Sequence, residues 1–152
     1  MFKKMCESKN CTAWSLTALR VILGLVLVYH GYPKLFGDEA TKNGLIQFFS
    51  STVLPAPSAM VMLAGVLELL GGLLLILGAY TGIAAQVLSV QFLVIVLFVK
   101  LKMGWKSMEL DLLILAALQV LAAMGAGALS IEGLLGKKEP DSVPVQPGMG
   151  SK

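Results

Sequence analysis

The residue best placed to do chemistry is Glu68, the single charge in the apolar stretch AGVLELLGGLLLILG, residues 64–78. An ionised carboxylate in hydrocarbon costs on the order of several kcal/mol unless it is partnered. The residues three and four positions away share its helical face and are all small: Ala64, Gly65, Gly71 and Gly72. Small residues let a second helix approach closely. Glu68 is therefore expected to point into a helical bundle and not at lipid.

Arg20 is the predicted partner of Glu68. It lies about seven residues into the first apolar segment, and Glu68 lies about ten residues into the second, antiparallel segment. At about 1.5 Å per residue, both side chains fall within several Å of mid-depth. Two interpretations stay open. The pair is either a structural ion pair that fixes the register of two helices, or an intramembrane site for a ligand or a proton.

A second polar group is expected at the opposite membrane edge. Its members end the first and third segments and begin the fourth: Tyr29, His30, Lys34, Lys100, Lys102, Glu109 and Asp111. Carboxylates are favoured at the start of a helix, and lysines extend to lipid headgroups, so most of these residues have a structural explanation. His30 has neither explanation, and histidine is the side chain that changes charge near neutral pH. Glu68 and His30 are thus the candidate catalytic residues.

The sequence gives little support for a metal site or for a redox-active pair of cysteines. His30 and Glu109 make two candidate ligands, whereas a catalytic zinc site usually takes three, so no metal site is predicted. Cys6 and Cys11 have a C-x4-C spacing that is too loose for a redox C-x-x-C motif, and both are expected to be reduced thiols. The glutamines within the apolar segments are interpreted as ties between helices: Gln86, Gln91 and Gln119.

The composition places these residues in a membrane. The 152 residues are 57% hydrophobic and only 14% charged, whereas a soluble domain is about a quarter charged. Residues 69–99 form a run of 31 without a charge, and residues 112–131 form another of 20, while a membrane helix needs about 20. The net charge of +3 sits at segment ends, which indicates a lipid bilayer as partner and no nucleic acid.

The segments predict an all-α, antiparallel four-helix bundle that spans the membrane. The expected spans are 13–32, stopped by Pro33, then 58–78, 82–100 and 108–129. They form one domain over 13–132, preceded by a tail at 1–12 and followed by a disordered tail at 133–152. The loop at 37–57 either lies on the membrane surface or packs as a plain loop.

The N-terminus begins like a signal peptide, but Arg20 interrupts its apolar part and no cleavage site follows Tyr29, so a retained helix is expected. An even number of spans puts both termini on one side. That side carries seven Lys and Arg residues against five on the other. The positive-inside rule then favours cytoplasmic termini in the plasma membrane.

Three stretches of the chain resemble the DoxX family of small bacterial and archaeal membrane proteins. They are LRVILGLVLVYHGYPKLFG, GVLELLGGLLLILGAYTGIAA and MELDLLILAALQVLAAMGAGALSIE, within residues 19–132. The most specific elements are H-G-x-x-K at residues 30–34 and E-L-x-G-G at residues 68–72. The resemblance implies a four-helix membrane bundle. The chain departs from the family pattern at Lys100, because the pattern has a histidine near the end of the third span.

Some members of that family resemble the membrane subunit of thiosulfate:quinone oxidoreductase, and others are linked to thiol and oxidative-stress complexes. This implies a subunit of a redox complex, in which a quinone headgroup or a small sulfur oxyanion binds among five residues: Arg20, His30, Lys34, Glu68 and Glu109. Electrons would come from a soluble or membrane redox partner, or from the bound sulfur compound. The alternative is a non-catalytic assembly factor, chaperone or scaffold. Catalysis and a homo-oligomeric state are both left open.

Overall fold

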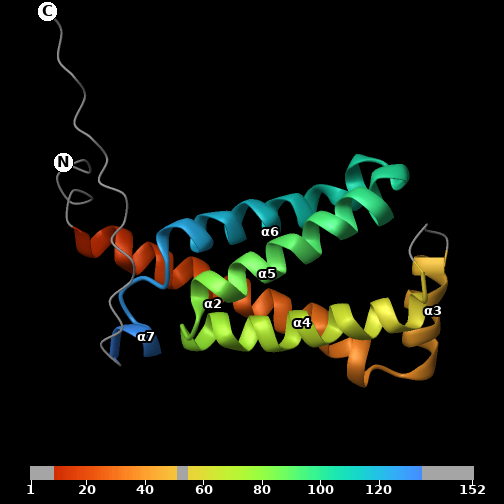
Figure 1. Cartoon of the computed structure of the whole chain (residues 1–152), viewed down its shortest axis with the longest axis horizontal. Coiled ribbons are helices and arrows are strands. Elements are labelled where there is room, and N and C mark those ends of the chain that lie inside the picture. Colours follow the sequence, from red (N-terminus) through yellow and green to blue (C-terminus); the bar gives the residue numbers. More distant parts are fainter. Residues whose placement is uncertain (1–8, 51–54, 135–152) are drawn as a thin grey trace, which may run out of the picture.

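The computed structural model describes residues 9–50 and 55–134. Four long helical segments cross the molecule side by side, and two short helices lie at opposite ends (Figure 1). The helices are α2 (Lys9–Phe36), α3 (Glu39–Ser50), α4 (Pro57–Leu77), α5 (Thr81–Val94), η1 (Ile95–Lys100), η2 (Leu101–Met103), α6 (Trp105–Met124) and α7 (Ile131–Leu134). The described residues contain no strand, and the all-α bundle is confirmed. Cys6 and the tail beyond residue 134 lie outside the described residues.

Four helices are long and apolar enough to cross a membrane. They are Cys11–Phe36, Pro57–Leu77, Thr81–Lys100 and Trp105–Met124, with mean hydropathies of 1.9, 2.5, 2.4 and 1.7. Large apolar side chains are exposed on their outer faces, as a lipid environment requires: Ile22, Leu70, Ile83 and Leu113 are examples. The expected integral membrane bundle is thus the observed one, although α6 ends at Met124, before the predicted end of the fourth span.

The prediction that Pro33 stops the first helix is wrong. Helix α2 continues through Pro33 to Phe36, and the backbone N–H of Gly37 donates to the carbonyl of Pro33 at 3.0 Å. Membrane helices tolerate an internal proline where neighbouring helices pack against them. As a result Lys34 lies on the helix one turn beyond His30, on the same face.

Glycines set the spacing between α2 and α4. A Cβ added at Gly24 would lie 2.7 Å from the carbonyl oxygen of Gly72, and one added at Gly31 would lie 2.8 Å from the backbone nitrogen of Leu69. These distances are too short for a side chain, so the two backbones touch. This contact fixes which residues of the two helices face each other.

A tight hairpin joins α4 to α5. Gly78 takes a left-handed conformation with φ 68°, and the N–H of Ala79 donates to the carbonyl of Leu74 at 3.0 Å. Glycine adopts this conformation at little cost, which makes it a common helix terminator. The core between the helices is closed by leucines that are almost fully buried: Leu27, Leu75, Leu88, Leu118 and Leu121.

Helix α3 occupies most of the predicted loop at 37–57, of which residues 51–54 are outside the described part. Asp38 precedes α3, and its carboxylate accepts a hydrogen bond from the Thr41 N–H at 3.0 Å. Hydrogen bonds from Thr41 hold the pKa of Asp38 below its usual value. Phe49, near the end of α3, packs against Val61 of α4 and Ile95 of η1. Helix α3 therefore caps one end of the bundle (Figure 1).

Candidate functional site

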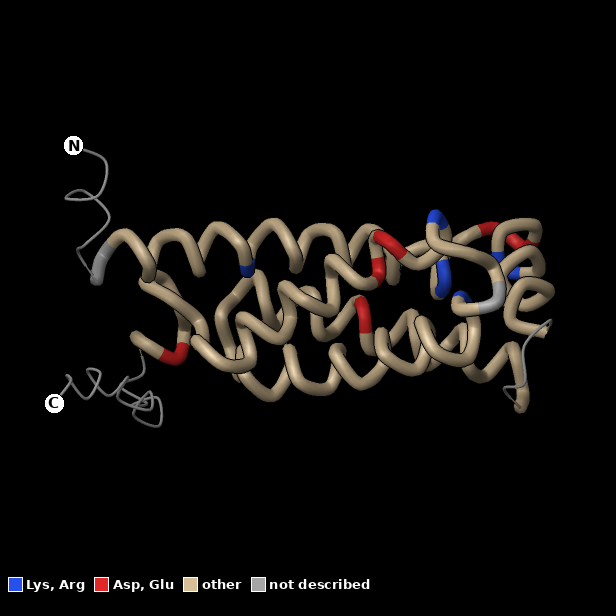
Figure 2. Tube along the Cα trace, turned by 90° about the horizontal axis from the view of Figure 1, so that it is seen from above, with Lys and Arg blue, Asp and Glu red and all other residues tan. Residues whose placement is uncertain are grey.

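Charged residues gather at the α3 end of the bundle (Figure 2). Two ion pairs lie there within the membrane-length helices, Lys34 with Glu68 and Lys100 with Asp111. Each pair joins two different helical segments, so the four charges come from α2, α4, η1 and α6. An intramembrane ionisable residue is rare and usually functional. Four of them in one region mark the candidate site.

Glu68 is 1% exposed and both of its carboxylate oxygens are engaged. Lys34 Nζ donates to Oε2, and Gln91 Nε2 of α5 donates to Oε1 at 3.0 Å. The predicted pairing of Glu68 with Arg20 is wrong. Because Gly31 of α2 packs against Gly65 and Leu69, Glu68 lies beside the last turns of α2, where Lys34 is the nearby cation.

Lys100 and Asp111 form the second ion pair across the η1–α6 turn. Asp111 is 6% exposed in the second turn of α6. Lys100 ends a π-helical segment in which Ile95, Val96 and Val99 are buried. A π-helical turn holds more residues than an α-helical one and is frequent at functional sites, because it changes which side chains face inward. Here it turns Lys100 towards the bundle interior.

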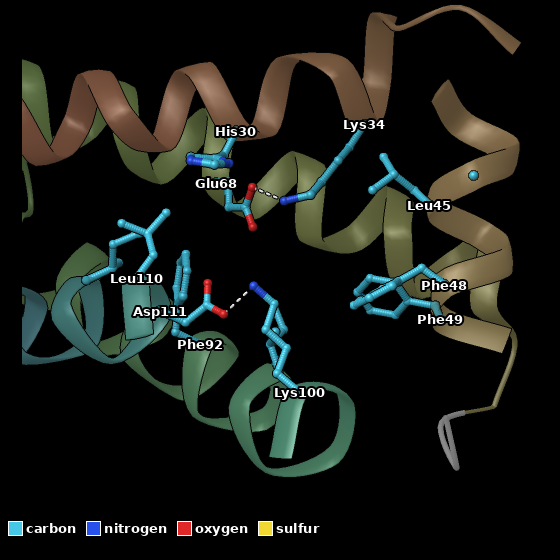
Figure 3. A pocket seen from close by; sticks show the side chains of 13 residues that line it. His30, Lys34, Leu45, Phe48, Phe49, Glu68, Phe92, Lys100, Leu110 and Asp111 are labelled. Atoms are coloured by element: carbon cyan, nitrogen blue, oxygen red, sulfur yellow. Dashed lines mark hydrogen bonds and ion pairs between the residues drawn. The ribbon is translucent and has the colours of Figure 1, made fainter. Parts of the chain in front are cut away.

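The two ion pairs face one cavity of about 390 Å³ (Figure 3). His30 extends into it from α2, and Leu45, Phe48 and Phe49 of α3 close its outer end. The remaining lining residues are Gly44, Phe92, Ile95, Leu110 and Ile114. The cavity therefore combines apolar walls, two ammonium groups, two carboxylates and one imidazole. This arrangement suits a small ligand that has both apolar and polar parts.

Arg20 lies at the other end of the bundle, away from this cavity. It is 2% exposed and donates to the carbonyl of Leu129. The charge of Glu132 acts on it, and the Glu132 carboxylate accepts a hydrogen bond from the Thr81 N–H at 3.1 Å. Thr17 Oγ1 accepts another from Ala128 at 3.0 Å. Arg20 thus ties the segment after α6 to α2, whereas Glu132 ties that segment to the start of α5, and Arg20 is not part of the candidate site.

An Arg20→Met variant is expected to loosen the segment at 125–134 without emptying the cavity. Removing the donor to the Leu129 carbonyl costs about 1–2 kcal/mol of local stability, which corresponds to roughly tenfold faster amide exchange. Hydrogen exchange followed by mass spectrometry measures it. Thr17→Val should act in the same direction, because Thr17 holds the same segment. Unchanged exchange in both variants would contradict this role.

The predicted site residue Glu109 and the thiol of Cys11 both stand apart from the site. Glu109 is exposed and does not line the cavity, because Asp111 occupies the inward position at the start of α6. Cys11 lies in α2 near the Arg20 end. Within residues 9–50 and 55–134, no group of three or more His, Cys, Asp and Glu side chains is arranged to hold a metal ion.

Sequence reasoning did not assign Gln91, Lys100 or Asp111 to a site. The expected tie between helices at Gln91 is present, and its partner is the buried Glu68. Contact with lipid headgroups for Lys100 and the helix dipole for Asp111 account for each charge alone and do not predict that the two residues pair. One signal in the sequence favours their pairing: opposite charges flank a short turn between two apolar segments.

A family model described as DoxX matches residues 15–101, more than half of the chain. The chain belongs to the DoxX family. The resemblance seen in the sequence is thereby confirmed, and the protein is a multi-pass membrane protein. The site residues within the matched range are His30, Lys34, Glu68, Gln91 and Lys100. Asp111 lies beyond it, so the second ion pair reaches outside the part that matches the DoxX model.

A relative of this DoxX-family chain comes from Bacillus subtilis (strain 168) and is named "Putative oxidoreductase CatD". It is 36% identical over 123 residues, which make up 79% of this chain and 87% of the relative. The comparison with solved structures gives no significant match.

Proposed function

We propose that this DoxX-family protein is the membrane subunit of a quinone- or sulfur-compound-linked redox complex, with a quinone headgroup bound in the polar cavity. The observation that carries the proposal is the pair of buried carboxylates, Glu68 and Asp111, which face one cavity at membrane depth with His30 beside them. The oxidoreductase name of the Bacillus subtilis relative supports the same class of chemistry.

The residues around the cavity have distinct roles in this proposal. Reduction of a quinone to a quinol takes up two electrons and two protons. Lys34 and Lys100 are hydrogen-bond donors to the carbonyl oxygens of the ring. Glu68 and His30 carry the protons, because they are proton-exchanging groups in a site lined mostly by apolar side chains. The electrons come from a soluble or membrane partner subunit, or from a sulfur compound oxidised at the site.

The proposed setting is the plasma membrane with both termini in the cytoplasm. The side of the membrane that holds both termini carries seven Lys and Arg residues, and the other side carries five. The positive-inside rule assigns the side with more of them to the cytoplasm. In this orientation the polar cavity lies towards the outer leaflet, since it is at the end of α2 opposite to Lys9. Sulfur compounds from outside the cell would then approach from the α3 side.

Co-purification tests this proposal. The protein is isolated in mild detergent with native lipids, extracted with solvent and examined for quinone by mass spectrometry, and quinone reduction by thiosulfate is followed in the same preparation. We expect near-stoichiometric quinone, and Glu68→Gln should slow reduction by at least about 100-fold. Lys106→Met is the control, because Lys106 is exposed and lines no wall of this cavity.

The alternative function is a non-catalytic assembly factor, chaperone or scaffold. One observation favours it: each carboxylate at the cavity already has a lysine partner, as in a purely structural pair. In that case no quinone is retained, other proteins co-purify, and Glu68→Gln affects only stability. That result would overturn the redox proposal.

A further inference from the structure

A second cavity of about 370 Å³ adjoins the first at the α3 end. It lies between α4 and α5 and is apolar except for one glutamine. Its walls are Phe49, Met60, Leu63, Ala64, Leu67, Val87, Val90, Gln91, Val94 and Ile95. Among the residues that the structure describes, no charged side chain lines it. Such a cavity accepts hydrocarbon and rejects a polar group.

The mouth of this second cavity faces the hydrocarbon of the bilayer. Leu63 and Val90 line it and remain 51% and 56% exposed, and both lie within helices of membrane length, Pro57–Leu77 and Thr81–Lys100. An occupant therefore enters sideways between α4 and α5, directly from the lipid. It does not need to cross water.

The second cavity is continuous in its walls with the polar one. Phe49 and Ile95 line both cavities. Gln91 lines the apolar cavity and donates to Glu68 at 3.0 Å, and Glu68 lines the polar one. The Gln91–Glu68 contact thus marks the boundary between the two. A molecule with a polar head and a hydrocarbon tail matches the polarity of these two neighbouring cavities.

The charges of the polar cavity select among such molecules. Two lysines are balanced by two carboxylates, Glu68 and Asp111, so the cavity has no excess of positive charge for an anionic phospholipid head. A neutral head is the better match. Resting on the proposed function, we infer that the apolar cavity binds the isoprenoid tail of the quinone whose head occupies the polar cavity, and that the ligand enters between α4 and α5.

Binding of quinones that differ only in tail length tests this inference. The protein is reconstituted in nanodiscs, loaded with a one-unit or a four-unit isoprenoid quinone at equal mole fraction in the lipid, isolated and extracted for mass spectrometry. Val90→Phe and Leu63→Phe narrow the apolar cavity at its exposed mouth, where a larger side chain leaves the packing intact. Val120→Phe and Leu113→Phe on α6 are the matched controls, since neither residue lines either cavity.

We expect the native protein and both controls to retain the four-unit quinone at least about tenfold better than the one-unit quinone. Val90→Phe and Leu63→Phe should abolish this preference and leave one-unit binding unchanged. The tail reaches the cavity from lipid and not from water, so the preference comes from van der Waals contacts between the tail and the cavity walls; a tenfold preference corresponds to about 1.4 kcal/mol. Equal retention of both quinones in every protein would overturn the tail site while preserving the proposed headgroup site. Retention of neither quinone, or of a phospholipid in their place, would overturn both.

Discussion

Replacing Lys34 with methionine is expected to lower the free energy of unfolding by about 3–5 kcal/mol. The variant leaves the buried Glu68 carboxylate without its cation, while Gln91 supplies only one neutral hydrogen bond. A buried charge that loses its partner costs far more than the pair contributes when intact. Denaturant unfolding in a single detergent, followed by circular dichroism, measures the change.

The control and the rescue separate this effect from a general loss of charge. Lys106→Met removes an exposed lysine and should change stability by less than about 0.5 kcal/mol. The double variant Lys34→Met with Glu68→Leu replaces the whole pair with apolar side chains and should recover most of the loss. A double variant as unstable as Lys34→Met alone would contradict the ion-pair explanation.

The error in the predicted partner of Glu68 has a geometric cause. Counting residues from the predicted helix ends placed Arg20 and Glu68 at similar depth, but the ends alone do not determine the register of two helices. The backbone contacts between Gly24 and Gly72 and between Gly31 and Gly65 determine it. They put Glu68 beside Gly31, eleven residues or about 16 Å along α2 from Arg20.

The fold class was predictable because it depends on quantities that a sequence displays directly. Uncharged runs of membrane length require helices, since only helices or closed barrels satisfy every backbone group in lipid. The tight α4–α5 hairpin follows from Gly78, and the inward direction of Glu68 follows from the small residues on its face. These features are local, and local rules are sufficient for them.

The rest of the site depends on contacts between distant segments. Glu109 and Asp111 are only two residues apart in the sequence. The packing of α6 decides that Asp111 is buried and Glu109 exposed. Lys100 reaches the cavity because it ends a π-helical segment, and the amino-acid composition does not predict where such a segment forms. Helix α3 closes the cavity because Phe49 packs on α4 and η1, and a sequence pattern cannot specify that docking.

Gly31→Val is expected to destabilise the bundle by roughly 3 kcal/mol, the upper end of the usual range for overpacking. Even a Cβ at this position would lie 2.8 Å from the Leu69 backbone nitrogen and 2.9 Å from the Gly65 carbonyl oxygen. Those atoms are backbone, so the helices themselves must separate. The same unfolding measurement in detergent reports the loss.

The matched control for the unfolding measurement is Gly44→Val in α3, and it controls for stability alone because Gly44 lines the polar cavity. A Cβ at Gly44 has no neighbour within 4 Å, so the change should stay within about 0.5 kcal/mol of zero. Gly31 lies between His30 and Lys34, and separating α2 from α4 also moves Lys34 away from Glu68. Gly31→Val should therefore lose quinone retention under conditions in which the variant is still folded. A stable variant with normal retention would show that the α2–α4 register set by Gly31 does not build the site.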